Sequence, residues 1–204
     1  SRGSLPVFAR TGKLAAVLYV HPAETGRGMA DIKHVVRGAL DMTLTVRGWR
    51  GTPKEIGSRD SAPYADGGAA LQACLRLLDR LRSGPLVGCD VNLGRLDAGD
   101  RVGSVPDVAR AQFRVLFDSP RTRRELVTGM ERETSVALRD VPAGRGTYTA
   151  TLDTTGLRTN PGAVDWDSPP CRDLRQAIAD VTGTEPRSYT GHYAGDIRYP
   201  IRLL

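Results

Sequence analysis

Strand-like and helix-like segments follow one another in a definite order over the middle of the chain. Apolar and polar residues alternate in some of these segments, which is typical of strands with one buried face, while others repeat Leu at helical spacing. The strands are predicted over 38–49, 91–96, 109–117 and 147–152, and the helices over 68–82 and 121–138. This order predicts a ferredoxin-like βαββαβ fold, a four-stranded antiparallel sheet covered by two helices on one face. We also expect Arg114 and Leu116 to lie on opposite faces of their strand.

The segments on either side of this region differ in character. Residues 14–20 form a continuous apolar run, typical of a buried strand, and a loop is predicted over 23–31 and a long loop over 52–68. His34 is placed in a surface segment without a role. A capped helix is predicted to begin at 167–170 and to end at Gly183, before a last strand near 195–198.

Neither flank has enough strands to close a sheet alone, which indicates that part of a second domain is missing. The sequence therefore predicts an α+β chain in which the βαββαβ unit is inserted in an incomplete α/β domain. We divide it into 1–36, 37–152 and 153–204, with the inserted unit in the middle range.

Composition excludes several classes of function. The net charge is +6, but 26 of the 29 basic residues are Arg, spread along the chain, and only 5% of residues are aromatic. Such a pattern does not predict nucleic-acid binding. No apolar run approaches the roughly 18 residues that span a membrane. The three cysteines are widely spaced without a CxxC pair, which is typical of reduced thiols in a cytoplasmic protein.

The segment 91–120, with its "VPD" turn at 105–107, and the strand at 38–49 together resemble a known lid, or dimerisation, domain. That domain belongs to the zinc-dependent amidohydrolases that include acetylornithine deacetylase, succinyl-diaminopimelate desuccinylase, aminoacylase and glutamate carboxypeptidase. The resemblance implies cleavage of an amide bond in an N-acylated amino acid or small peptide. It also implies two zinc ions per complete site, or cobalt or manganese, and a homodimer formed through the lid.

The resemblance assigns three residues to the active site. His21 stands where the family has a Glu that binds one metal ion, and neutral imidazole coordinates zinc well. A strand-end His bonded to backbone is the alternative, and Glu24 is the alternative carboxylate ligand. Asp196 and Arg198, in "GDIRYP", resemble a substrate-binding segment of the family in which the Arg binds a substrate carboxylate. The alternative is an ion pair between Asp196 and Arg198 without a role in binding.

Four positions differ from the residues that the family carries in the active-site part of its lid. Thr52 stands in place of the His that stabilises the oxyanion, and Gly67, Ser104 and Leu116 replace an Asn, an Asn and a substrate-binding Arg.

Most of the family's other metal ligands and its general base would precede residue 1, and its final metal-binding His would lie further downstream. We therefore interpret the chain as part of an enzyme that does not hydrolyse substrate by itself. The alternative is a non-catalytic homologue that serves as a dimerisation or small-molecule-binding module.

Overall fold

The computed structural model describes residues 25–48, 70–99, 105–140 and 148–191. These residues belong to two compact units. The larger unit comprises Ala39–Phe117 and Thr122–Arg158, and the smaller unit comprises the remaining segments. Each unit is described by itself below.

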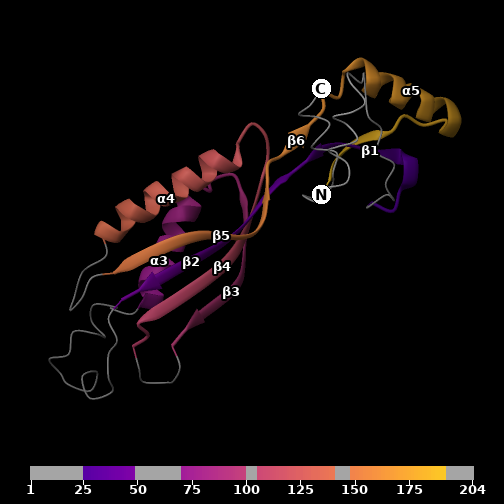
Figure 1. Ribbon diagram of the computed structural model, residues 1–204. Coiled ribbons are helices and arrows are strands. Elements are labelled where there is room, and N and C mark those ends of the chain that lie inside the picture. Colours follow the sequence, from indigo (N-terminus) through magenta and orange to yellow (C-terminus); the bar gives the residue numbers. More distant parts are fainter. Residues whose placement is uncertain (1–24, 49–69, 100–104, 141–147, 192–204) are drawn as a thin grey trace, which may run out of the picture. The chain divides into compact units, whose positions relative to one another are not determined.

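The larger unit is a four-stranded sheet with both of its helices on one face (Figure 1). Its elements are β2 (Gly38–Arg47), α3 (Ala70–Ser83), β3 (Asp90–Ala98), β4 (Val108–Phe117), α4 (Arg123–Arg139) and β5 (Thr149–Thr159). The strand order is β3-β4-β2-β5, and β3 pairs antiparallel with β4. Each helix thus connects two strands that have another strand between them, which confirms the ferredoxin-like fold.

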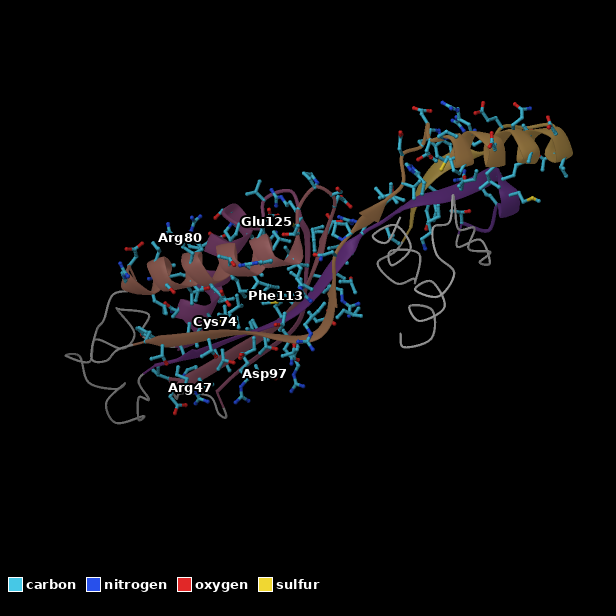
Figure 2. The ribbon with its side chains drawn as sticks, turned by 45° about the horizontal axis from the view of Figure 1, so that its top comes forward. Arg47, Cys74, Arg80, Asp97, Phe113 and Glu125 are labelled. Atoms are coloured by element: carbon cyan, nitrogen blue, oxygen red, sulfur yellow. The ribbon has the colours of Figure 1, made fainter. Side chains whose placement is uncertain are left out.

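The core lies between the sheet and the helices because strand residues alternate between the two faces. The core cluster includes Leu40, Met42, Leu44 and Val46 from β2, and Ala109, Ala111, Phe113, Val115 and Phe117 from β4. Figure 2 shows Cys74 of α3 and Phe113 inside this layer, with Arg47 and Asp97 on the opposite side of the sheet. The second face of the sheet therefore carries polar residues, and none of the described helices covers it (Figure 1).

One detail of the predicted strand pattern is wrong. Arg114 and Leu116 are both half-buried and flank the buried Val115. They therefore share the face of the sheet that lies away from the helices, called the open face below. Residues two apart in a strand point the same way, because the side-chain period is 2.

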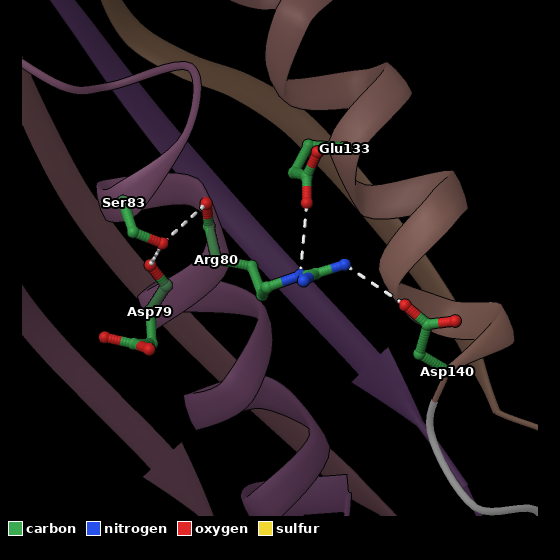
Figure 3. Close-up of polar contacts among 5 residues, drawn as sticks. All are labelled: Asp79, Arg80, Ser83, Glu133 and Asp140. Atoms are coloured by element: carbon green, nitrogen blue, oxygen red, sulfur yellow. Dashed lines mark hydrogen bonds and ion pairs between the residues drawn. The ribbon is translucent and has the colours of Figure 1, made fainter.

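Local signals position the helix ends. Thr122 Oγ accepts a hydrogen bond from the Glu125 N–H (3.3 Å), and the Glu125 carboxylate accepts one from the Thr122 N–H (2.8 Å). This capping box begins α4 two residues after the predicted start. The two helices are joined at the surface by Arg80 of α3, whose guanidinium reaches Glu133 (3.2 Å) and Asp140 (3.1 Å), as Figure 3 shows.

Within its described residues, the smaller unit contains a three-stranded sheet and one longer helix. Its elements are η1 (Gly28–Ala30), β1 (Asp31–Val36), β6 (Gly162–Ala163), α5 (Pro169–Thr182) and β7 (Arg187–Gly191). The strand order is β6-β1-β7, with β1 antiparallel to β6 and parallel to β7. The helix is confirmed, and it ends at Gly183 in the left-handed conformation, with φ of 70°. His34, predicted in a surface segment, lies half-buried in the central strand of this sheet.

Helix α5 leaves its apolar stripe uncovered within the described residues. None of its residues is buried, and Val181 is 79% exposed. Among the described helices, none is long and apolar enough to cross a membrane.

Candidate functional site

The site residues predicted from the resemblance fall where the structure gives no description. His21, Thr52, Asp196 and Arg198 all lie outside the described residues, and so do Glu24, Gly67 and Ser104. Their roles remain predictions. Leu116 is described, and its half-buried side chain lies on the open face of β4, where the resemblance expects an Arg.

A polar hollow of about 370 Å³ lies on the open face of the larger unit's sheet. It is built by the middle of β2, β3, β4 and β5, whose alternate residues turn away from the helices. Its lining includes Asp41, Asn92, Gly94, Gln112, Arg114, Thr155 and Gly156.

An ion pair forms the charged centre of the hollow. Arg114 Nε donates to Asp41 Oδ1 (2.6 Å), and Arg114 Nη2 donates to Asp41 Oδ2 (2.9 Å). The side chains are 35% and 23% exposed, so the pair is only partly screened by water. The hydrogen bond from Arg114 holds the pKa of the Asp41 carboxyl below its ordinary value, although partial burial opposes this shift.

Strand β5 approaches the same carboxylate through its backbone. The Leu157 N–H donates to Asp41 Oδ2 (3.0 Å), and a Cβ on Gly156 would collide with the Asp41 carboxylate. Glycine is therefore required here by space rather than by backbone conformation. These contacts fix Asp41 from two neighbouring strands.

The remaining groups of the hollow are neutral donors and acceptors. Thr43 and Thr155 share a hydrogen bond between their hydroxyl groups (3.2 Å), and Asn92 is paired with Arg114 across the β3–β4 ladder. Because Asp41 already compensates the charge of Arg114, the hollow is suited to amide and hydroxyl groups rather than to a free anion. No group of three His, Cys, Asp or Glu side chains that could hold a metal ion occurs within the described ranges.

Sequence reasoning missed Asp41 and Arg114 as a pair. The signal available was Asp41 on the polar face of β2 and two guanidinium groups, of Arg110 and Arg114, on the same face of β4. The two residues pair because β2 lies next to β4 in the sheet, although they are 73 positions apart in the chain.

Comparisons with known proteins were made by sequence and by structure. No protein-family model matches the chain, and no curated protein sequence matches it significantly. Solved structures do match. Aminopeptidase PepT from Bacillus cereus has a TM-score of 0.60 at 13% identity, covering 84% of this chain and 43% of its own.

Two further solved structures show the same fold. An amidase of the hydantoinase/carbamoylase family from Burkholderia phymatum has a TM-score of 0.60 at 15% identity, covering 88% of this chain and 42% of its own. A tripeptidase from Staphylococcus aureus has a TM-score of 0.61 at 11% identity, covering 86% of this chain and 43% of its own. The chain thus has the fold of part of these peptidases and amidases, and it spans less than half of their length.

Proposed function

We propose that this chain is part of a metal-dependent amidohydrolase that cleaves an amide bond in an N-acylated amino acid or a small peptide. The observation that carries the proposal is the fold likeness, which extends over 84–88% of the chain in three proteins named as peptidases or an amidase. The inserted βαββαβ unit would serve as the lid, and the segments 1–38 and 159–204 would belong to the catalytic domain.

The described residues do not by themselves fit a two-zinc centre, since no cluster of three potential ligands occurs among them. We therefore derive no catalytic step through a metal. In the proposed enzyme His21 supplies one ligand, and Asp196 and Arg198 bind substrate. Thr52 would donate one hydrogen bond to the developing oxyanion, a weaker interaction than a charged imidazole provides.

A specific observation supports the second candidate, a non-catalytic homologue that keeps the lid for dimerisation or small-molecule binding. At the position expected for a substrate-binding Arg, the open face carries the apolar Leu116, and the neighbouring Arg114 is held by Asp41. An Arg that already makes a bidentate pair is a poor anchor for a substrate carboxylate, because binding would require breaking that pair.

We further propose a homodimer formed through the lid. Strand β3 lies at one edge of the sheet, and its Leu93 and Leu96 are 46% and 39% exposed. Exposed strand edges with apolar side chains favour pairing with a second copy. We also propose the cytoplasm as the location, since the three cysteines are widely spaced in the sequence and form no CxxC pair.

The test compares this 204-residue chain with a longer version that includes the upstream and downstream coding sequence. Each is assayed against N-acetyl and N-carbamoyl amino acids and di- and tripeptides, and its bound metal is measured. We expect metal and hydrolysis only in the longer version, with lower metal occupancy after His21→Ala. An inactive longer protein with intact fold would favour the non-catalytic candidate.

Thr52→His distinguishes a weakened enzyme from one that has lost its chemistry. A stronger donor at the oxyanion should raise turnover of the longer protein about 100-fold if the metal site works. Thr45→His, on the polar face of β2, is the matched control and should leave turnover unchanged. Hydrolysis with bound metal in the 204-residue chain itself would refute the interpretation as part of an enzyme.

A further inference from the structure

His34 in the smaller unit is held by contacts that orient its ring. It is the extra residue of a bulge in β1, because Lys33 pairs with Tyr189 and Val35 already pairs with Thr190 in β7. Bulges redirect a side chain and are common near functional sites.

Two hydrogen bonds join His34 to one residue of the chain. The His34 carbonyl accepts from the Val164 N–H (2.9 Å), and His34 Nδ1 lies 2.9 Å from the Val164 carbonyl oxygen. The imidazole is thereby fixed by its own backbone and by its ring.

The same contacts determine the tautomer of the ring. A carbonyl oxygen can only accept, so Nδ1 carries the hydrogen, and in the neutral imidazole the lone pair is on Nε2. Ser188 Oγ of β7 lies 2.7 Å from Nε2. The Ser188 hydroxyl therefore donates its proton toward His34, in a short O–H···N contact.

The ring is also supported from the side. The centroids of the His34 and Trp166 rings are 4.9 Å apart, with their planes tilted by 50°. Trp166 is itself covered by the guanidinium of Arg175 of α5, 4.7 Å from the indole centroid. A base that is oriented by a third group and packed against an aromatic ring cannot easily turn away from its partner.

We propose that Ser188 is a nucleophilic residue activated by His34, and that it accepts an acyl group from activated esters. Nucleophile, base and orienting acceptor occur in the arrangement that covalent catalysis requires, with the Val164 carbonyl as the orienting group. The proposed reaction needs no metal ion, and Ser188 is exposed, so a small acyl donor can reach it.

The reaction conserves atoms and electrons as an ordinary acyl transfer. Ser188 Oγ attacks the ester carbonyl carbon while its proton passes to His34 Nε2. The new Oγ–C bond forms, the C–O bond to the leaving alcohol breaks with its electron pair, and His34 returns the proton to that group or to water.

The experiment uses the 204-residue chain with two probes, p-nitrophenyl acetate and an alkyl fluorophosphonate. The ester should release about one equivalent of nitrophenolate per chain in a burst. The fluorophosphonate should form a stable Ser188 adduct, with loss of fluoride, located by peptide mass spectrometry. Ser83 and Ser135 are internal controls, because each exposed hydroxyl donates to a backbone carbonyl.

Two variants distinguish activation of the Ser188 hydroxyl by His34 from simple exposure of this hydroxyl. Ser188→Ala should abolish the burst and the adduct, while His34→Gln should slow adduct formation about 100-fold, since it removes the base. Should His34→Gln fail to fold, Ser188→Cys in the unchanged background answers the same question. Its new thiol should be alkylated at least about tenfold faster than the half-buried Cys171, because a neighbouring His favours the thiolate.

Several results would overturn the proposal. Labelling of Ser83 or Ser135 at the rate of Ser188 would show exposure without activation. A folded His34→Gln variant that reacts like the parent chain would exclude His34 as the base. No adduct at Ser188 in the folded chain, or a Ser188→Cys thiol no faster than Cys171, would equally contradict it.

Discussion

At the level of single residues, the Asp41–Arg114 pair shows how a partly buried charge contributes to the stability of the fold. We expect Asp41→Asn to lower the free energy of unfolding by roughly 1–3 kcal/mol, because charged hydrogen bonds are replaced and Arg114 loses its counter-ion. Urea denaturation at pH 7 measures this change. The control is Asp97→Asn, which breaks an exposed pair with Arg95 and should cost about 0.5 kcal/mol or less.

The same carboxylate makes a prediction about pH. The pKa of Asp41 is lowered in the folded chain from its ordinary value of 3.8, so its stabilising effect is complete above that value. It is lost as the pH falls through the lower folded pKa. The stability difference between the parent chain and Asp41→Asn should therefore shrink below pH 3.8. A difference that stays constant through this range would contradict the pKa shift.

Cys74 illustrates burial of a reactive group. It is fully buried in the helix–sheet layer, and this burial raises the pKa of its thiol to about 11. We expect iodoacetamide at pH 8 to alkylate Cys171 and to spare Cys74 until urea unfolds the chain, as mass spectrometry would record. Equal reaction of the two thiols in native buffer would show that the core opens readily.

At the level of elements, the capping box of α4 is the clearest local determinant. Thr122→Ala removes the hydroxyl that accepts from the Glu125 N–H, and we expect a loss of about 1 kcal/mol in unfolding free energy. Thr128→Ala is the matched control, an exposed site within the same helix. Because Ala favours helix more than Thr, this control should be neutral or slightly stabilising. Equal losses would show that the cap contributes nothing specific.

The packing of α3 depends on apolar burial far more than on its surface ion pairs. Leu77 is 1% exposed, and Leu77→Ala should cost about 2–5 kcal/mol by leaving a cavity. Arg80, whose side chain is 48% exposed, bridges to Glu133 and Asp140, yet Arg80→Met should cost only about 0.5 kcal/mol. Thermal and urea denaturation of the two variants test this order. A larger loss for Arg80→Met would mean that the ion pairs hold the helices together.

At the level of the whole molecule, the proposed dimer depends on the edge strand β3. We expect light scattering at high protein concentration to give the mass of a dimer, and Leu93→Lys to give that of a monomer, since a charged edge resists pairing. Val136→Lys on α4 places the same charge at a site 43% exposed and should leave the dimer intact. A monomer in the parent chain would count against association through the lid.

The sequence alone was sufficient for the elements of the larger unit and their order, because this information is local. The alternation of β2 and β4, the Leu repeat of α3 and the cap of α4 each act within a few residues, and each predicted element occurs. The end of β5 was not predicted correctly, since this strand continues to Thr159 beyond the predicted 152. Strand length there depends on the neighbouring β2 rather than on local composition.

Only the tertiary structure decided the pairings that create candidate chemistry. β1 has a mixed sequence, DIKHVV, and becomes a central strand through β6 and β7, which follow more than 120 residues later. His34 meets Ser188, and Asp41 meets Arg114, across such pairings. Short-range periodicity determines which face a residue occupies, whereas the identity of its neighbour depends on strand order, which is set by the burial of the whole sheet.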